Sequence, residues 1–136
     1  MSEGPAPSRM TSIILVDDDQ LLTDALTVVL HRQPDLRVVD VAGTCAAALA
    51  SLSRTCPDVL LLDVSLPDGD GLSLVPELNR LCPGTYILVL TSFSEQETLM
   101  RAIETGVNGF VSKVRPLSEV ISAIRRAARG RNRGRA

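Results

Sequence analysis

The sequence predicts a three-layer α/β fold, in which a parallel five-stranded sheet lies between two layers of helices. Two observations support this prediction. Short apolar runs that suit strands alternate five times with segments whose apolar residues recur at helical spacing. The connections between them are short and rich in Gly, Pro, Ser and Asp, as turns are. Such strict alternation is typical of a parallel sheet, because each parallel pair needs a crossover connection that a helix supplies.

The predicted strands fall into two classes by their apolar content. They occupy residues 13–16, 37–42, 59–63, 86–90 and 108–112. The first, third and fourth are apolar up to their last residues, as strands buried on both faces are. The second carries Arg37 and Asp40 and the fifth is weaker, which suits the two edges of the sheet. This pattern favours a flavodoxin-like (βα)5 sheet with strand order 2-1-3-4-5.

Each predicted helix has a signal for its beginning or its end. The helices occupy residues 20–32, 45–54, 72–81, about 94–106 and 116–129. Asp19 and Thr44 are placed to cap the first two, and residues 94–97 have the S-x-x-E form of a capping box. Pro76 limits the third helix, which either begins late or is kinked there. The only histidine, His31, lies at the polar end of the first helix, and we assign it no role.

The chain length and composition fit one domain. With 136 residues and 45% apolar content, the chain can bury a proper core but has no room for a second folded domain. We expect a disordered lead-in over residues 1–11, the folded domain over 12–129 and a basic linker or tail over 130–136. The apolar runs are too short to cross a bilayer and no signal peptide is visible, so no membrane association is expected.

The three cysteines, Cys45, Cys56 and Cys82, form no C-x-x-C pair. The missing pair and the odd number of cysteines suggest neither a zinc site nor a disulfide framework, and the neighbours of these cysteines are small and apolar. We therefore expect reduced packing residues in a cytosolic protein.

Polar side chains are predicted to meet at the carboxyl edge of the sheet, where ligands bind in open α/β folds. The first strand runs into an acidic stretch that includes Asp17 and Asp18, and the third ends at Asp63. In the order 2-1-3-4-5 these strands are neighbours, so the three carboxylates converge. Thr91 and Lys113 follow the fourth and fifth strands. Taken alone, Asp63 would be equally suited to cap the turn that follows it.

Clustered carboxylates need a counter-charge. At about 4 Å and an effective dielectric near 20, each like pair costs on the order of 4 kcal/mol, against roughly 5–15 kcal/mol of net stability for a domain. A divalent ion removes this repulsion, and oxygen ligands suit Mg²⁺ or Mn²⁺, which share their coordination shell with phosphate. Lys113 and Thr91 can then contact phosphoryl oxygens, while Asp63 acts as a nucleophile that forms an aspartyl phosphate.

Four motifs at these strand ends resemble the receiver domain of bacterial response regulators over about residues 13–129. They read V-D-D-D, L-L-L-D-V-S-L-P-D-G-D-G-L, L-V-L-T-S and G-F-V-S-K. The resemblance implies that Asp63 accepts phosphate from a phosphohistidine of a sensor histidine kinase. It implies a metal site made by Asp17, Asp18, Asp63 and the backbone carbonyl of Ser65. It also implies that Thr91 and Phe110 form the switch and that Lys113 contacts the phosphoryl group.

Two residues depart from the family pattern. Val114 follows Lys113 where the family often has a proline joined by a cis bond. A cis bond before a residue other than proline costs about 2.5–4 kcal/mol, so we expect a trans bond or a distorted loop. Phe110 stands where tyrosine is common, so its ring can turn but has no hydroxyl to pair.

The C-terminal segment of the chain is basic and indicates what the domain would control. From Val114 onward seven arginines face one glutamate, a net charge of +6, which leaves −8 for the first 113 residues. A solvated linker is the favoured interpretation, with any DNA binding weak and salt-sensitive. The segment I-R-R-A-A-R-G-R-N-R-G-R-A resembles the linker to a helix-turn-helix module of LuxR-like regulators, which this chain lacks. A transcription regulator is therefore expected; a stand-alone receiver that acts by protein contact, and a homodimer, stay open.

Three other functions fit less well. An aspartate-nucleophile phosphatase would carry D-x-D, but Val64 and Ser65 follow Asp63, so we expect no turnover enzyme beyond slow autodephosphorylation. A calcium loop over residues 63–70 is broken by Pro67 and lacks an acid at Leu74. A nucleotide-binding fold would need a Gly-rich loop after the first strand, where this chain has acids.

Overall fold

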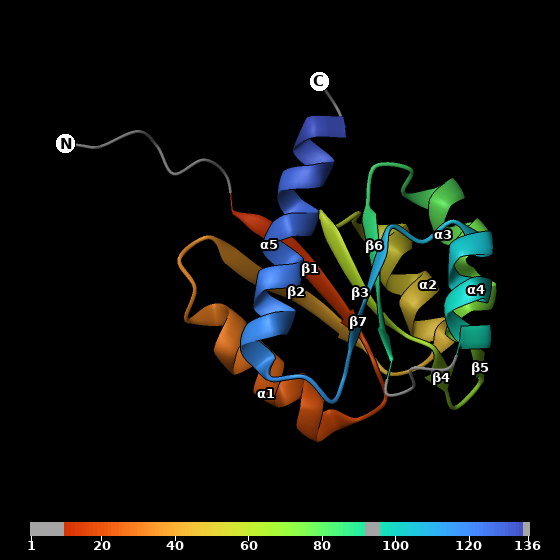
Figure 1. Cartoon of the computed structure of the whole chain (residues 1–136), viewed down its shortest axis with the longest axis horizontal. Helices are drawn as coiled ribbons and strands as arrows, with labels where there is room; N and C mark the ends of the chain where they lie inside the picture. Colours follow the sequence, from red (N-terminus) through yellow and green to blue (C-terminus); the bar gives the residue numbers. More distant parts are fainter. Residues whose placement is uncertain (1–9, 92–95, 135–136) are drawn as a thin grey trace.

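A central sheet of five parallel strands organises the molecule (Figure 1). This computed structural model describes the backbone of residues 10–91 and 96–134 and the side chains of residues 10–91 and 100–130. The sheet strands are β1 (Thr11–Val16), β2 (Leu36–Ala42), β3 (Val59–Asp63), β6 (Tyr86–Thr91) and β7 (Gly109–Ser112). Their order is β2-β1-β3-β6-β7, which confirms the flavodoxin-like prediction and the placement of the two weaker strands at the edges.

Helices cover both faces of this sheet. They are α1 (Gln20–His31), α2 (Cys45–Arg54), α3 (Val75–Leu81), α4 (Gln96–Thr105) and α5 (Leu117–Gly134). Alternate residues of β1 enter different cores: Ile13 and Leu15 pack with α1 and α5, whereas Ile14 and Val16 pack with α2, α3 and α4. The central strands are therefore buried on both faces, as a parallel sheet between helical layers requires.

The helix starts follow the predicted signals. The Asp19 side chain accepts a hydrogen bond from Leu22 N at 3.2 Å, and Thr44 accepts one from Ala47 N at 3.0 Å. A 3₁₀ turn, η1 (Gly71–Leu74), precedes α3, so Pro76 lies in the first turn of a helix that begins late. Residues 94 and 95 of the predicted capping box lie outside the described residues.

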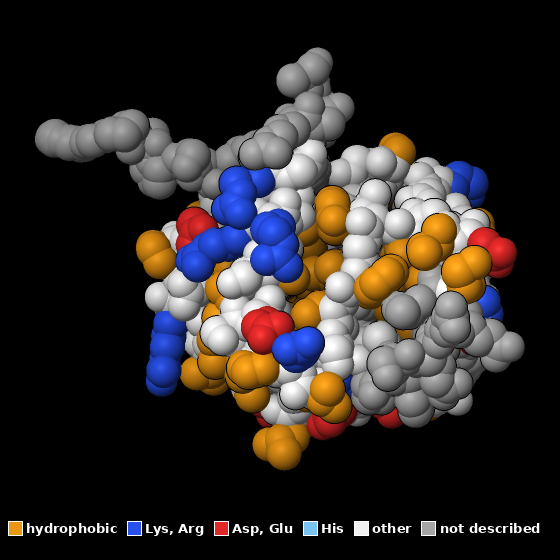
Figure 2. All heavy atoms as spheres, in the orientation of Figure 1, with side chains coloured by type: hydrophobic (Ala, Val, Ile, Leu, Met, Phe, Trp, Pro, Cys, Tyr) orange, Lys and Arg blue, Asp and Glu red, His pale blue; other side chains and the backbone are white. Residues whose placement is uncertain are grey.

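The last helix is longer than predicted. We expected it to end at about Arg129, with Gly130 closing it, but α5 runs to Gly134. One interior glycine costs only about 1 kcal/mol relative to alanine, and the arginines around it are good helix formers. Figure 2 shows Lys and Arg side chains gathered over α5. Arg125 of this helix pairs with Asp35, with 2.9 Å between Arg125 Nη2 and Asp35 Oδ1. Among the described helices, none is both long and apolar enough to cross a membrane.

The start of the first strand and the environment of His31 differ from the predictions. The first strand begins at Thr11, inside the predicted lead-in, because Thr11 N donates to Asp35 O at 2.8 Å beside the start of β2. Residues 1–9 lie outside the described residues. His31, to which the sequence assigned no role, makes a hydrogen bond to the sheet. Its Nε2 accepts from Val38 N of edge strand β2 at 3.1 Å.

The prediction of reduced cysteines is wrong for two of the three. Cys56 and Cys82 form a disulfide with a Cα–Cα distance of 5.5 Å, while Cys45 is free and half-buried. The two bridged residues are 26 positions apart, and only the packing of α3 beside the α2–β3 connection brings them into disulfide range. Cysteine composition therefore no longer supports a cytosolic location.

Candidate functional site

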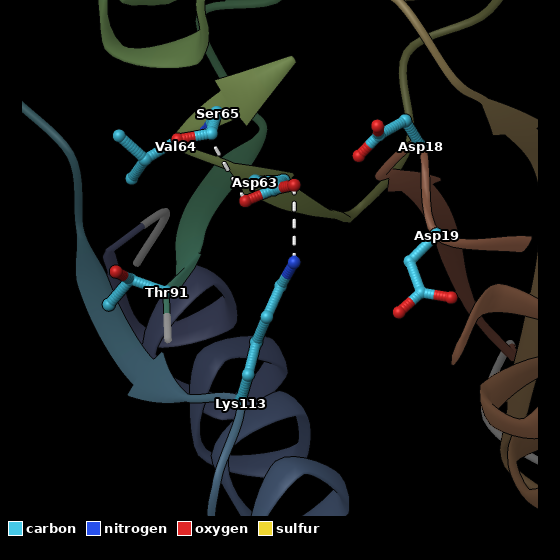
Figure 3. Close-up of a pocket in the computed structure, with 7 residues that line it drawn as sticks. All are labelled: Asp18, Asp19, Asp63, Val64, Ser65, Thr91 and Lys113. Atoms are coloured by element: carbon cyan, nitrogen blue, oxygen red, sulfur yellow. Dashed lines mark hydrogen bonds and ion pairs between the residues drawn. The ribbon is translucent and has the colours of Figure 1, made fainter. Parts of the chain in front are cut away.

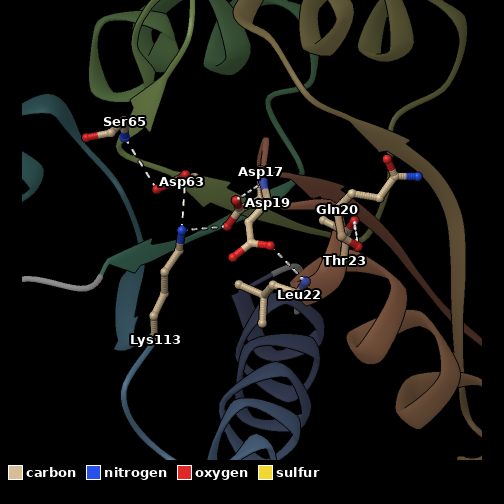
Figure 4. A network of polar contacts seen from close by, with 8 residues as sticks. All are labelled: Asp17, Asp19, Gln20, Leu22, Thr23, Asp63, Ser65 and Lys113. Atoms are coloured by element: carbon tan, nitrogen blue, oxygen red, sulfur yellow. Dashed lines mark hydrogen bonds and ion pairs between the residues drawn. The ribbon is translucent and has the colours of Figure 1, made fainter.

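The polar residues predicted at the carboxyl edge of the sheet lie together in the structure. Asp17 follows β1, Asp63 ends β3, Thr91 ends β6 and Lys113 follows β7. Lys113 Nζ lies 2.8 Å from Asp17 Oδ2 and 3.1 Å from Asp63 Oδ2 (Figure 4). The order of the strands thus joins residues from four separate parts of the chain, which confirms the predicted convergence.

The acidic cluster of Asp17, Asp18 and Asp63 fits a hard divalent cation. One carboxylate oxygen from each residue lies within 4.8 Å of the others. Asp17 and Asp63 are buried, with exposed fractions of 4% and 5%, and Asp18 is exposed. Asp17 Oδ1 accepts a hydrogen bond from Asp19 N at 2.9 Å, whereas Oδ2 accepts no well-directed hydrogen bond from the described residues, although the Lys113 ammonium is close. A buried carboxylate oxygen with spare lone pairs in an all-oxygen donor set suits Mg²⁺ or Mn²⁺.

The Asp63 carboxylate borders an open cavity of about 330 Å³ (Figure 3). The lining residues are Asp18, Asp19, Asp63, Val64, Ser65, Thr91 and Lys113. Two of them, Asp19 and Val64, were not predicted as site residues. The sequence predicted Asp19 only as the cap of α1. Its place in the acidic stretch after β1 is the signal that could also have assigned it to the cavity lining.

The pKa values of Asp63 and Lys113 are both raised in this site. Burial raises the pKa of Asp63, and the charge of Asp17 raises it further, while Lys113 offsets only part of the rise. Burial also works against the charge on Lys113, but its contacts with Asp17 and Asp63 outweigh that cost and raise the pKa of the ammonium. The site therefore holds more negative charge than one lysine neutralises, which again favours a bound cation.

A small hairpin positions the end of β3. Strands β4 (Ser65–Leu66) and β5 (Gly69–Asp70) pair immediately after Asp63, and this hairpin was not predicted. Gly71 N donates to Val64 O at 2.6 Å, and a Cβ at Gly71 would lie 2.0 Å from Asp63 O. A side chain at position 71 therefore cannot fit without displacing the backbone of Asp63. Ser65 N contacts Asp63 Oδ1 at 3.3 Å, while the metal-binding role of the Ser65 carbonyl stays a prediction.

The two predicted switch residues occupy different environments. Thr91 is 4% exposed beside the cavity, whereas Phe110 on β7 is 41% exposed. Lys113 N donates to Thr91 O at 2.7 Å, so the backbone after β7 is tied to the end of β6. The Lys113–Val114 peptide is trans, in agreement with the expectation for this departure from the family pattern. The switching roles of Thr91 and Phe110 stay predictions.

The fold and this site define a class of α/β protein with an acidic, cation-compatible cluster and a lysine at the carboxyl edge of a five-stranded parallel sheet. The family model described as response regulator receiver domain matches residues 13–125. The chain belongs to this family, and the resemblance seen in its motifs is confirmed.

Curated relatives include a transcriptional activator and an oxygen regulatory protein. The chain is 37% identical over 123 residues to the DNA-binding transcriptional activator DevR/DosR of Mycobacterium tuberculosis, covering 90% of this chain and 57% of that protein. It is 33% identical over 119 residues to the oxygen regulatory protein NreC of Staphylococcus carnosus, covering 87% of this chain and 55% of that protein. The chain thus spans a little over half the length of these relatives.

Solved structures agree with this assignment. A LuxR-family two-component response regulator from Aurantimonas superposes with a TM-score of 0.83 at 26% identity, over 89% of this chain and 86% of that one. The signal receiver domain of the putative response regulator NarL from Mycobacterium tuberculosis superposes with a TM-score of 0.82 at 27% identity, over 90% and 98% of the two chains.

Proposed function

We propose that this chain is a phosphoacceptor, which takes a phosphoryl group from a sensor histidine kinase onto Asp63 in a Mg²⁺-dependent reaction. The observation that carries this proposal is the shared contact of the Lys113 ammonium with the buried carboxylates of Asp17 and Asp63, beside an open cavity. Such a site offers a nucleophile, a place for a cation and a mobile positive charge within one phosphate-sized region.

The chain's own residues account for the transfer. A carboxylate oxygen of Asp63 attacks phosphorus; the new O–P bond forms as the P–N bond to the donor histidine breaks, and the imidazole keeps the bonding electrons. Lys113 moves from Asp63 toward a phosphoryl oxygen as a point charge, and the Thr91 hydroxyl donates to another. A Mg²⁺ ion held by Asp17, Asp18, Asp63 and the Ser65 carbonyl would stabilise negative charge on the phosphoryl oxygens.

Phosphorylation then shifts the domain between two conformations. The phosphoryl group on Asp63 carries about −1.5 to −2 charges in place of the single charge of the free carboxylate, and this attracts Thr91 and Lys113. Movement of Thr91 leaves space for Phe110 to turn inward and reshapes the surface of α4, β7 and α5. Shifting a two-state equilibrium from 1:99 to 99:1 needs about 5.5 kcal/mol of differential interaction, which a few charge-assisted contacts and a metal ion can supply.

The output that we propose is control of transcription through a DNA-binding domain outside this chain, in the cytoplasm. The support is that DevR/DosR is described as a DNA-binding transcriptional activator and that the matched region covers only 57% of it. The chain itself is proposed to be no turnover enzyme: it is labelled once and loses the phosphoryl group slowly by autodephosphorylation.

The test is labelling by a small phosphodonor such as acetyl phosphate with Mg²⁺, followed by intact-mass measurement. We expect one phosphoryl group per chain, none for Asp63→Asn, and normal labelling for Asp24→Asn, which removes an exposed carboxylate on α1. Chelation of the metal should abolish labelling of the unsubstituted chain. Undiminished labelling of Asp63→Asn would show that the acceptor is wrongly assigned, and repeated turnover of the donor without bound phosphate would indicate a phosphatase.

A further inference from the structure

The Cys56–Cys82 disulfide lies at the end of the sheet opposite the acidic cluster. Cys56 precedes β3 and Cys82 follows α3, whereas Asp63 ends β3. We propose that this pair is a reversible thiol–disulfide exchange site, at which the sulfur of Cys56 reacts first with a small thiol or disulfide and the bridge restrains opening of the phosphoacceptor segment. The proposal goes beyond phosphotransfer and does not depend on it.

The two bridged cysteines differ in exposure. Cys56 is exposed, whereas Cys82 is 2% exposed and belongs to the core beneath α2 and α3. Attack on a disulfide requires a nucleophile to approach one sulfur along the S–S axis, so access decides which sulfur exchanges. A small thiolate can therefore reach Cys56, while Cys82 is the sulfur released.

Each sulfur of the bridge lies near a backbone carbonyl. Cys56 Sγ lies 3.6 Å from Leu81 O, and Cys82 Sγ lies 3.6 Å from Leu52 O. When the bridge is reduced, each S–H can donate to the carbonyl already beside it, so the buried Cys82 thiol does not become an unsatisfied polar group. On reduction the two sulfurs must separate to van der Waals distance, which a turn of the exposed Cys56 side chain can provide.

The bridge closes a covalent loop around the proposed phosphoacceptor. Its ends are 26 residues apart, and the loop contains β3 with Asp63, the β4–β5 hairpin, η1 and α3. The α3 helix has seven residues, too few to be stable alone, so it depends on packing and on its attachment at both ends. The bridge anchors its carboxyl end to the residues that lead into β3, and so opposes local opening of this segment.

The exchange is balanced with a small-molecule disulfide as oxidant. The Cys56 thiol loses a proton and its thiolate attacks the small disulfide, which forms a mixed disulfide and releases one small thiolate. Cys82 then loses its proton and attacks the Cys56 sulfur, which forms the protein disulfide and releases the second small thiolate. The two cysteines lose two electrons and two protons, and the small disulfide becomes two thiols.

The third cysteine is an internal control. Cys45 is half-buried and unbridged, and burial together with Asp68 raises the pKa of its thiol. It has no partner cysteine within the described residues with which to form a bridge.

The test follows each cysteine by peptide mass spectrometry in the folded full chain, reduced with dithiothreitol and then exposed to oxidised glutathione. We expect the unsubstituted chain to re-form the Cys56–Cys82 bridge, and Cys82→Ser to accumulate glutathione at Cys56. In Cys56→Ser, Cys82 should react at least about tenfold more slowly than Cys56 does in Cys82→Ser, because it is buried. Equal rates, or no bridge after prolonged oxidation, would overturn the proposal.

A second measurement needs no substitution. Hydrogen exchange of the Cys82 amide, which donates to Leu78 O at 2.8 Å, should be on the order of tenfold slower in the bridged than in the reduced chain. Amides of β2, outside the loop, should change far less. Identical exchange of the Cys82 amide in both states would show that the bridge does not restrain this segment.

Discussion

Lys113 Nζ lies 2.8 Å from Asp17 Oδ2, a buried oxygen that accepts no well-directed hydrogen bond from the described residues. The lysine thus compensates a carboxylate that has little else to neutralise it.

Removing that ammonium should destabilise the metal-free chain. We expect Lys113→Ala to lower the free energy of unfolding by about 1–3 kcal/mol, because two buried carboxylates lose their counter-charge. Added Mg²⁺ should restore part of this loss, because the ion supplies positive charge to the same carboxylates. Urea denaturation with and without Mg²⁺ measures both effects. Arg115→Ala is the matched control, since its exposed pair with Glu119 should contribute less than about 1 kcal/mol. A Lys113→Ala chain as stable as the control would contradict the electrostatic account of this site.

A methyl group at position 71 should disturb the end of β3. The added Cβ of Gly71→Ala would lie 2.0 Å from Asp63 O, so we expect a loss of at least about 1–3 kcal/mol in stability and weaker labelling of Asp63. Gly43→Ala is the control, because the nearest atoms to its Cβ are 3.9 Å away. Thermal unfolding and phosphodonor labelling of both variants test the prediction, which fails if the two behave alike.

The buried Ser51 hydroxyl should make stability depend on pH. Its hydrogen bond is the main cause that lowers the pKa of Asp40 below the usual 3.8. A lowered folded pKa means that this stabilisation is present above about pH 4 and is lost as the pH falls through the folded value. We expect Ser51→Ala to cost about 0.5–1.5 kcal/mol at pH 7 and less at pH 3. Ser53→Ala, which removes a hydroxyl on the exposed side of α2, should show no such trend. A pH-independent difference would exclude Asp40 as the source.

The ion pair between Asp70 and Arg101 links the hairpin after Asp63 to α4. Both side chains are partly exposed, so the pair itself should contribute no more than about 1 kcal/mol. Asp70 also accepts from Leu72 N at 2.9 Å, which caps η1. We therefore expect Asp70→Ala to destabilise the chain by about 1 kcal/mol more than Arg101→Ala, as measured by urea denaturation. Equal losses would mean that the cap contributes nothing.

Local patterns in the sequence determined much of this structure. Alternating apolar periods predicted the β/α order, and charges such as Arg37 and Asp40 identified an edge strand. The predicted strand order then predicted that Asp17, Asp63 and Lys113 meet, because parallel strands present their carboxyl ends at one edge. The motif residues at those ends also indicated the family that the comparison confirmed.

Other features were not predicted from the sequence, either because they depend on contacts between residues far apart in the chain or because their local signal is weak. Cys56 and Cys82 meet only because α3 packs beside the start of β3, and the continuation of α5 through Gly130 depends on a short run of good helix formers outweighing one weak position. The β4–β5 hairpin has two residues in each strand, too few for a periodic signal. Sequence periodicity records which face of an element is buried, whereas spatial proximity between distant segments is decided only when those faces pack together.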